Sequence, residues 1–568
     1  MHDNNEFDVA VVGYGPTGEM ASILLGQMGY RVAAFERWPA VYPLPRAVHY
    51  DDEIARVFQL AGVSDEVREI TQPVPDFYEW RNKDGEVLLR IDWSQQGLSG
   101  WPVANFFSQP ELQKVLGEKA QSLPTVEVNW GWEAQEISHH DDHVELTVRK
   151  GHPGPAGQWI PEEETRTVRT RYLIGADGAN SFVRRHMGAP VTDLGFNFDW
   201  LILDVIPHEE REWSPMNWQL CDPERPTTIV SGGPGRRRWE FMRLPGETIE
   251  DLNTTETAWR LLEPWGRNPE NTTLERHVVY RFQARWGESW RQGRLLLAGD
   301  AAHLMPPFAG QGMCSGLRDA VNLAWKLDLV LSGKASDTIL NTYESERLVN
   351  VRHFIDFSVE LGSLQCVTDP QEAAERDERM IASREDPSVA PPIPNPPHRL
   401  GPGLLHEGDP LVGALSVQGR VRFGERTGLF DAVVGRGWTV LSPVADPRDV
   451  LEEEELAFLD GIGGRLVRVA PEGASGDGTV VDLEEKYIDW FEGAGVEAIV
   501  VRPDFYVYGT ARTMEELPRL VSSLQAALGR PDEHPSPAEA GVSRRQPPLY
   551  DATPEPPRPQ DSDPAGLS

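Results

Sequence analysis

Cysteine is scarce in this chain of 568 residues, which contains only Cys221, Cys314 and Cys366. Their odd number and wide spacing exclude a disulfide scaffold, a CxxC redox pair and a cysteine zinc site. The chain also lacks an apolar run of about 18 residues, which excludes a membrane-spanning helix. Its first residues do not show the basic segment, apolar core and cleavage site that are typical of a secretory signal peptide. These absences predict a cytoplasmic protein with no membrane partner.

Basic residues are in the minority, because 54 Lys and Arg stand against 89 Asp and Glu and give a formal net charge of −35. Such an acidic surface repels the phosphates of DNA and RNA. We therefore expect no nucleic-acid partner and interpret the acidity as a solubility feature. No cluster of residues with metal-ligand spacing stands out in the sequence, so no metal site is expected.

Two proline-rich stretches divide the chain. Residues 387–404 are typical of an extended connector, and residues 531–568 have the polar composition of a disordered tail. Between them, short apolar strands and helical segments predict a small α/β module over residues 405–530. The strands are expected at residues 438–441, 466–469 and 498–501, and the helices at residues 488–491 and 517–528.

A glycine-rich turn lies between an apolar strand at residues 7–12 and a helical stretch. The turn reads Gly13-Tyr14-Gly15-Pro16-Thr17-Gly18, and a second strand at residues 30–35 leads into Glu36. This context is typical of a dinucleotide-binding βαβ unit, in which the glycines permit a tight turn, close approach of the pyrophosphate and close helix packing. The helix N-terminus offers N–H groups to the phosphates, and Glu36 can accept hydrogen bonds from a ribose. The unit predicts FAD or NAD without deciding between them.

Two later strands also end at an acidic residue beside a glycine. One strand leads into Asp177 and Gly178, and the other leads into Gly299 and Asp300. The glycine-rich residues 309–316 then precede a helix with apolar residues at three- and four-residue spacing. Glycines before a helix expose N–H groups at its positive end, which suits the negative charge of a reduced flavin ring. A carboxylate such as Asp300 suits the ribityl hydroxyls.

These three motifs, in this order, resemble the fingerprints of the group A flavoprotein aromatic hydroxylases, the p-hydroxybenzoate hydroxylase superfamily. Among its branches, residues 42–53, 221–226, 239–248 and 296–326 are similar to the 3-(3-hydroxyphenyl)propionate hydroxylases. The resemblance covers about residues 8–365. The sequence departs from that branch in the loop after Pro306 and at Met313-Cys314, near the expected substrate pocket.

The resemblance implies an α/β fold with a Rossmann-like FAD-binding domain, an inserted substrate-binding β-sheet domain and a C-terminal thioredoxin-like module without CxxC. The expected domain boundaries are residues 1–189 and 286–386 for the FAD-binding domain with its long helices, 190–285 for the substrate sheet, 387–404 for the connector, 405–530 for the module and 531–568 for the tail.

The family pattern also assigns roles to single residues. It implies that Arg46 holds the FAD pyrophosphate, that Gln109 and Asp300 contact the ribityl chain, and that Asp177 supports both FAD and the nicotinamide donor. The amides of residues 312–313 would face the pyrimidine edge of the flavin. The expected cofactor-binding residues are Gly13, Gly15, Pro16, Thr17, Gly18, Glu36, Arg37, Arg46, Gln109, Asp177, Gly178, Gly299, Asp300, Pro307, Gly310, Gly312 and Met313.

The implied reaction is hydroxylation of a small phenolic substrate with O2 and NADH or NADPH, through a flavin C4a-hydroperoxide. The strands expected within residues 190–283 would offer substrate contacts, and the candidates are Trp218, Gln219, Cys221, Phe241 and Pro307. No side chain identifies itself as the group that activates the phenol. His49 and His303 are candidates, although a histidine beside a tight turn often has a structural role instead. A homodimer is compatible with the pattern.

Other functions are compatible with the same motifs. The enzyme could act in natural-product tailoring, on a polyketide phenol or a hydroxypyridine, or the chain could bind flavin without catalysis. A flavin halogenase is disfavoured because the chain has no segment like WxWxIP. Oxidation of the donor that an aromatic compound stimulates would separate the catalytic readings from the non-catalytic one.

Overall fold

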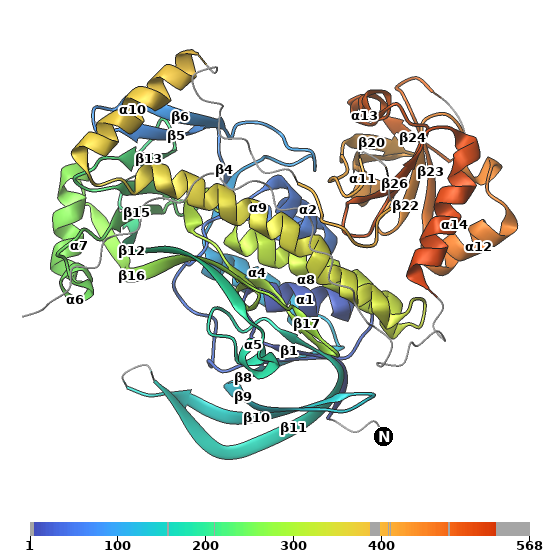
Figure 1. Cartoon of the computed structure of the whole chain (residues 1–568), viewed down its shortest axis with the longest axis horizontal. Coiled ribbons are helices and arrows are strands. Elements are labelled where there is room, and N and C mark those ends of the chain that lie inside the picture. Colours follow the sequence, from blue (N-terminus) through green and yellow to red (C-terminus); the bar gives the residue numbers. More distant parts are fainter. Residues whose placement is uncertain are drawn as a thin grey trace, which may run out of the picture. The chain divides into compact units, whose positions relative to one another are not determined.

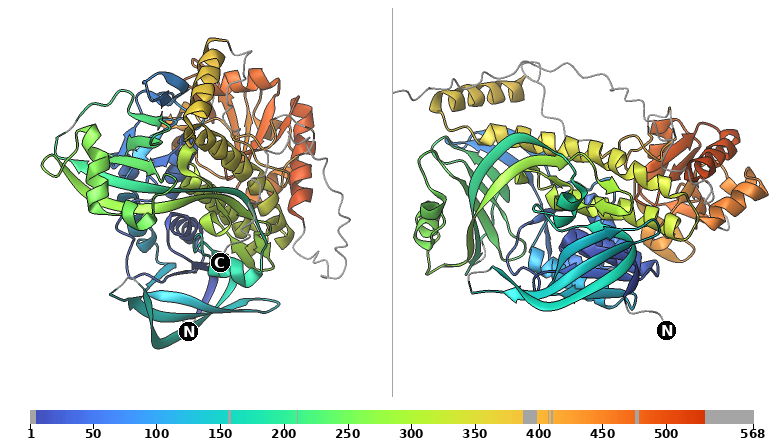
Figure 2. Two further views of the ribbon diagram at one scale, coloured as in Figure 1. Left: turned by 60° about the vertical axis from the view of Figure 1, so that its left-hand side comes forward. Right: turned by 60° about the horizontal axis from the view of Figure 1, so that its bottom comes forward.

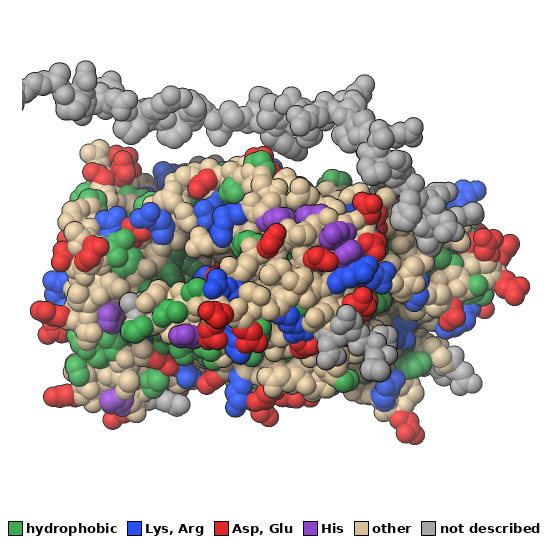
Figure 3. Space-filling view, turned by 90° about the horizontal axis from the view of Figure 1, so that it is seen from below, with side chains coloured by type: hydrophobic (Ala, Val, Ile, Leu, Met, Phe, Trp, Pro, Cys, Tyr) green, Lys and Arg blue, Asp and Glu red, His purple; other side chains and the backbone are tan. Residues whose placement is uncertain are grey.

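The computed structural model describes residues 5–155, 158–209, 211–386, 398–406, 408, 411–474 and 478–529. Residues 387–397 of the expected connector and residues 531–568 of the expected tail lie outside these ranges. Among the helices within them, none combines the length and apolarity needed to cross a bilayer. Acidic and basic side chains are interspersed on the face shown in Figure 3.

The first sheet has a parallel core in the strand order β18-β11-β1-β2-β8. Strands β1, β2 and β18 are largely buried, as is usual for parallel strands. Helix α1 links β1 to β2, which confirms the βαβ unit expected from the sequence. The bounds are β1 (Glu6–Val12), α1 (Pro16–Gln27), β2 (Val32–Glu36), β8 (Val126–Trp130), β11 (Trp159–Gly175) and β18 (Leu295–Leu297).

A second sheet has the order β19-β16-β12-β15-β14-β13-β5-β6. It includes two strands, β5 and β6, from the part of the chain before residue 190. Helices α6 (Ile249–Leu252) and α7 (Thr255–Leu262) lie on its outer side (Figures 1 and 2). The strands are β5 (Phe77–Asn82), β6 (Val87–Asp92), β12 (Val191–Pro207), β13 (Asn217–Cys221), β14 (Thr227–Ser231), β15 (Arg237–Met242), β16 (Thr272–Gly287) and β19 (His303–Leu304).

Two long helices, α8 (Gly312–Leu331) and α9 (Thr342–Gln365), lie side by side across the molecule (Figures 1 and 2). Helix α8 is the helix that the apolar periodicity of the sequence predicts, and it begins at the second glycine of the glycine-rich stretch. It packs against α1. The N-termini of α1 and α8 are therefore both fixed beside the first sheet.

The C-terminal part forms its own mixed sheet in the order β21-β20-β24-β23-β22-β25-β26. The three strands and two helices expected from the sequence are all present. The strands of this sheet and three of its helices are β20 (Arg420–Phe423), β21 (Arg426–Leu429), β22 (Thr439–Ser442), α12 (Glu453–Gly461), β23 (Arg465–Ala470), β24 (Thr479–Asp482), α13 (Lys486–Ala494), β25 (Ala498–Val501), β26 (Val507–Ala511) and α14 (Leu517–Leu528).

A buried carboxylate, that of Glu346 on α9, joins α8, α9 and the C-terminal part. Its Oε2 accepts hydrogen bonds from Lys326 Nζ at 2.8 Å and from Arg502 Nη2 at 2.7 Å, and its Oε1 accepts one from the backbone N–H of Leu404 at 2.7 Å. Burial by itself raises the pKa of Glu346, but the two cations outweigh it and lower the pKa to about 2. The charge is therefore held ionised inside the protein.

Replacing Glu346 by Ala is expected to lower the free energy of unfolding by about 3–5 kcal/mol, because the two buried cations lose their shared partner. Urea denaturation followed by circular dichroism would measure it. The control is Glu118→Ala, which removes the exposed pair with Lys114 at 3.9 Å and should change the same quantity by less than about 0.5 kcal/mol. Equal effects of the two substitutions would contradict the role of Glu346.

Candidate active site

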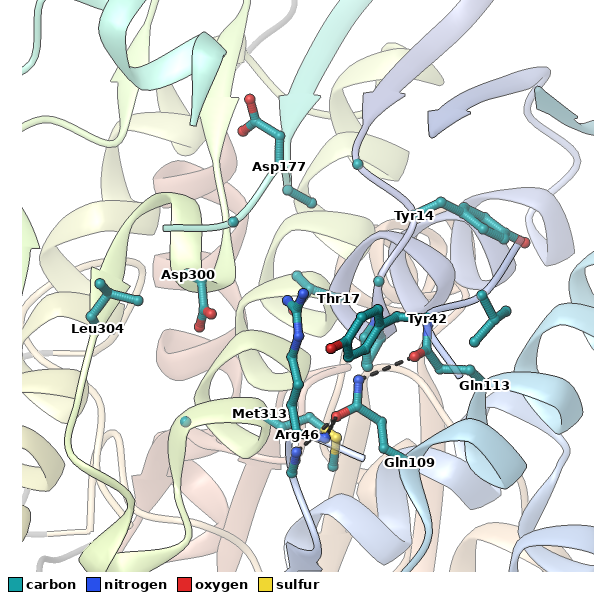
Figure 4. Close-up of a pocket in the computed structure, with 18 of the residues that line it drawn as sticks. Tyr14, Thr17, Tyr42, Arg46, Gln109, Gln113, Asp177, Asp300, Leu304 and Met313 are labelled. Atoms are coloured by element: carbon teal, nitrogen blue, oxygen red, sulfur yellow. Dashed lines mark hydrogen bonds between the residues drawn. The ribbon is translucent and has the colours of Figure 1, made fainter. Parts of the chain in front are cut away.

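A cavity of about 710 Å³ extends from the Gly13–Gly18 turn to the inner face of the second sheet. It collects side chains from the turn before α1, the end of β2, the loop after β18, the start of α8 and strands β5, β13, β14 and β15. Figure 4 shows several of the residues that line it. Segments that lie far apart in the sequence thus meet around one space.

One end of the cavity has the features of a phosphate site. Gly13 has a φ of +93°, and a Cβ there would collide with the backbone of Ala176. A Cβ on Gly15, in contrast, would meet no described atom within 4 Å, because this residue faces the cavity. Gly15 is the N-cap of α1, and no side chain caps the helix. The free N–H groups of this helix start could hold a pyrophosphate.

Glu36, at the end of β2, lies beside that turn. Its carboxylate accepts hydrogen bonds from the backbone N–H groups of Tyr14 and Trp38, each at 3.0 Å. Both oxygens keep further acceptor capacity, so the residue could bind the hydroxyls of a ribose. The adjacent Arg37 lines the cavity and approaches Glu133 at 3.7 Å.

Arg46 extends through the middle of the cavity toward Thr17 and Asp300 (Figure 4). Within the described ranges it has no ion-pair partner, and its guanidinium lies 4.9 Å from the ring of Tyr42. Gln109 fixes this segment, because its Oε1 accepts the backbone N–H groups of Arg46 at 3.1 Å and Ala47 at 2.7 Å. An arginine without a partner in a strongly acidic protein fits an anionic group such as a pyrophosphate.

Asp300 and the start of α8 form the next part of the cavity. The Asp300 carboxylate is open to the cavity, although the surrounding protein raises its pKa by burial. Gly310 has a φ of +64°, and Gly312 and Met313 open α8 with no side-chain cap among the described residues. This helix start could therefore offer N–H groups to the edge of a planar, electron-rich ring. Pro307 also lines this wall.

Asp177 and His303 have local partners. The Asp177 carboxylate accepts hydrogen bonds from Ser181 Oγ at 2.5 Å and from the N–H of Phe182 at 2.6 Å, so it holds the start of α5 (Phe182–Met187). In Figure 4 it points away from Asp300. His303 lies outside the cavity lining and bonds through Nε2 to Asp319 Oδ2 at 2.7 Å.

His49 lies in the cavity wall near the start of α8. Its Nδ1 donates a hydrogen bond to the carbonyl oxygen of Gly310 at 3.3 Å, since a carbonyl can only accept. Its Nε2 is buried and finds no hydrogen-bond partner in the described part of the chain. Burial lowers the pKa of the imidazole below its ordinary value. The ring is therefore neutral at pH 7, and Nε2 is free to accept a proton.

The opposite wall comes from the second sheet and from the segment before it. The ring of Trp93 stacks between His49 at 4.9 Å and Tyr78 at 4.3 Å, and the Tyr78 hydroxyl contacts Gln219. Gln219 also accepts a hydrogen bond from Thr228 Oγ1 at 2.5 Å. This end of the cavity is thus aromatic with a few neutral polar groups.

The other substrate candidates from the sequence do not line the cavity. Trp218 and Phe241 belong to the apolar cluster on the outer side of the sheet. Cys221 shares the inner face with Gln219 but lies beyond the lining, and burial raises its thiol pKa to about 12. The two-residue alternation along a strand accounts for these placements.

Arg238 and Glu240 line the cavity and were not among the sequence candidates. Arg238 pairs with Asp204, with Nε donating to Oδ1 at 2.7 Å, and it lies 3.7 Å from Glu240. Asp204 also pairs with Arg276 at 2.6 Å. Burial raises the pKa of Glu240 to about 7. A charged residue on each side of Trp239 in a buried strand was the sequence signal for this pair, whereas nothing near Tyr78 or Trp93 indicated a pocket.

Comparisons with known proteins agree with this geometry. Residues 6–358 match the family model described as "FAD binding domain", and residues 413–527 match the model described as "HcaD C-terminal domain". A protein named "Probable NADH-specific resorcinol 4-hydroxylase" from Rhodococcus jostii is 38% identical over 93% of this chain and 97% of its own length. The Escherichia coli K12 protein named "3-(3-hydroxy-phenyl)propionate/3-hydroxycinnamic acid hydroxylase" is 32% identical over 93% and 96%.

Solved structures share the fold. The flavin-dependent monooxygenase PieE, in complex with FAD and substrate, superposes with a TM-score of 0.74 at 21% identity, over 92% of this chain and 99% of its own. Aklavinone-11 hydroxylase, in a ternary complex with FAD and aklavinone, gives 0.72 at 24% identity, over 92% and 100%. Both the family model and the relatives cover most of the chain. The chain therefore belongs to the family of FAD-binding group A aromatic hydroxylases.

Proposed function

We propose that the protein hydroxylates a small, uncharged phenol of the resorcinol type, with NADH as electron donor. The observation that carries this proposal is the charge at the substrate end of the cavity. Arg238 is the cation that lines that wall, and it is already paired with Asp204, which Arg276 shares, and lies 3.7 Å from Glu240. A substrate carboxylate would meet no free cation among the described residues there. The printed name of the Rhodococcus relative supports both the substrate type and the donor.

Bound FAD would supply the redox chemistry, taking a hydride from NADH and using O2 to deliver one oxygen atom to the aromatic ring. The overall reaction would convert phenol, O2, NADH and a proton into a catechol-type product, water and NAD⁺. The residues of this chain would bind and orient both partners. They would also exclude bulk water from the reacting atoms.

We infer that His49 activates the phenol. Its unpartnered Nε2 would accept the proton of the substrate hydroxyl, while Nδ1 keeps its hydrogen bond to Gly310. The resulting phenolate has a more nucleophilic ring. The ring of Trp93 stacks on the imidazole and so favours this orientation of the base.

The other residues around the cavity would bind the cofactor. We propose that the start of α1 and Arg46 bind the pyrophosphate, that Glu36 binds the adenosine ribose, and that Asp300 binds the ribityl chain. Gln109 supports Arg46 through the backbone of residues 46–47. The amides of residues 312–313 would hold the pyrimidine edge of the ring. For Asp177, the hydrogen bonds to α5 support a structural contribution beside the cavity.

We also propose that the C-terminal part is thioredoxin-like. Helix α12 connects the parallel strands β22 and β23. The antiparallel pair β25 and β26 follows α13, and α14 comes after this pair. The order β23-β22-β25-β26 supports this assignment. Residues 405–530 contain no cysteine, so a thiol redox function is not proposed.

A substrate panel tests the proposal. Resorcinol should stimulate NADH oxidation with a kcat/KM at least about tenfold above that for 3-(3-hydroxyphenyl)propionate, because burying the carboxylate without a cation costs more than about 1.4 kcal/mol. Product analysis by mass spectrometry would separate hydroxylation from uncoupled oxidation. A preference for the carboxylated phenol would contradict the proposal.

Replacing His49 by Asn keeps a donor toward Gly310 and removes the base, so kcat with resorcinol should fall by about 10²-fold. The pH profile is the sharper readout. Because burial lowers the pKa of His49 below 6.5, the wild-type kcat should be constant above that pH and fall only on the acid side. The variant should lack this acid limb, whereas His140→Asn, on the exposed turn between β9 (Trp132–His139) and β10 (Val144–Pro153), should retain it. An unchanged acid limb in His49→Asn would rule out the assigned base.

Asp300→Ala should weaken FAD binding by about tenfold or more, because a carboxylate that contacts the ribityl hydroxyls is removed. Because this carboxylate is open to the cavity, its removal should leave the unfolding temperature of the apoprotein nearly unchanged. Fluorescence titration of the apoprotein with FAD measures the first effect. Unchanged FAD affinity would show that Asp300 has another role.

A further inference from the structure

Two side chains, one within the C-terminal part and one in the segment just before it, contact the FAD-binding part. The hydroxyl of Tyr506, just before β26, donates a hydrogen bond to Glu53 Oε1 at 2.7 Å. His398 Nδ1 lies 3.1 Å from Glu53 Oε2. Glu53 belongs to α2 (Asp52–Ala61), and its side chain is 2% exposed. A buried carboxylate of one part thus depends on donors supplied by the other.

Glu53 in turn holds Arg318 on α8. Arg318 Nε donates to Glu53 Oε2 at 2.6 Å, and Arg318 Nη2 donates to Asp51 Oδ2 at 2.5 Å. The guanidinium is 1% exposed. Burial alone would lower the pKa of this arginine and raise those of the two acids, but their mutual attraction outweighs burial on both sides. The group is therefore fully charged and rigidly paired.

Arg318 completes the connection to the cavity. Its Nη1 donates to Gln311 Oε1 at 2.9 Å, and Gln311 Nε2 donates to Asp51 Oδ2 at 2.9 Å. Gln311 is the N-cap of α8 and directly precedes Gly312 and Met313, which line the cavity. One buried chain of hydrogen bonds therefore runs from the hydroxyl of Tyr506 to the helix start that faces the cofactor.

We propose that Tyr506 is a positioning residue of the flavin site, acting through Glu53, Arg318 and Gln311 on the N-terminus of α8. This inference rests on the proposed function, specifically on the placement of the flavin ring at residues 312–313. Hydrogen bonds between buried charged groups are strong and directional, so each link constrains the next. The C-terminal part would thus tune the cofactor without touching it.

The expected sign follows from charge. The reduced flavin is more negative than the oxidised flavin, and a well-aligned helix N-terminus stabilises it. Loss of the Tyr506 hydroxyl would loosen that alignment and leave the charge of Glu53 less compensated. Both effects disfavour the reduced state, so the midpoint potential should become more negative. His398 acts in the same direction, since the hydrogen bond and charge of Glu53 raise its pKa although burial alone would lower it.

Tyr506→Phe is the direct test, and Tyr508→Phe is the matched control. Tyr508 is also buried, lies two residues further along and bonds through its hydroxyl to Ser523 at 3.1 Å, within the C-terminal part. We expect Tyr506→Phe to weaken FAD binding by about tenfold and to shift the midpoint potential to more negative values. Tyr508→Phe should stay within about twofold of wild type and keep its potential.

A dye-equilibration measurement gives the potential of the holoenzyme, and fluorescence titration gives the FAD affinity. A potential of Tyr506→Phe equal to that of Tyr508→Phe would overturn the proposal, whatever the stability of either variant. If Tyr506→Phe does not fold, His398→Ala replaces it, since that side chain is 28% exposed, and the same shift is expected. Neither readout needs a phenol, so failure here is distinguishable from failure of the proposed hydroxylation.

Discussion

The guanidinium of Arg318 is the contact on which the geometry of the site depends. A buried arginine must be paired, because an isolated charge in the interior is prohibitively unfavourable. The side chains of Asp51, Glu53 and Gln311 each accept a hydrogen bond from the guanidinium of Arg318. The same helix buries Asp319, Asn322 and Lys326. Helix α8 is therefore fixed by polar contacts that allow few alternative positions.

The cavity beside the start of this helix has two chemically distinct ends. At one end, glycines and uncapped helix starts expose N–H groups, and Arg46 has no ion-pair partner among the described residues, which suits a dinucleotide. At the other end, Trp93, Tyr78 and Gln219 offer aromatic and neutral polar surface, and Arg238 is already paired with Asp204. The division explains how one space can hold a doubly charged cofactor and an uncharged ring. His49 lies close to the boundary, against the carbonyl of Gly310.

Local features could be predicted from the sequence, and long-range features could not. The turn at Gly13, the strand end at Glu36 and the helix after Gly310 follow from backbone requirements within a few residues, so their sequence signals were sufficient. Asp177, expected at the cofactor, lies in the cavity lining, and its carboxylate also accepts hydrogen bonds from its own turn and from the start of α5. The sides of the second sheet that Trp218 and Phe241 occupy depend on strand register, which the sequence of one strand does not determine.

The features that could not be predicted depend on contacts between segments that are distant in the sequence. Tyr78 and Trp93 reach the cavity because β5 pairs with β13, a pairing across about 140 residues that no local pattern indicates. The hydrogen bond from Tyr506 to Glu53 joins residues 453 positions apart. The aromatic cavity wall and this hydrogen bond both exist only because the fold brings the segments together.

A crystal structure of the protein with FAD and resorcinol would show where both molecules bind. We expect the pyrophosphate at the Gly13–Gly18 turn, the pyrimidine edge of the flavin at the amides of Gly312 and Met313, and a resorcinol oxygen at His49 Nε2. A flavin ring held away from the start of α8, or a phenol bound with its hydroxyl turned from His49, would contradict this expectation.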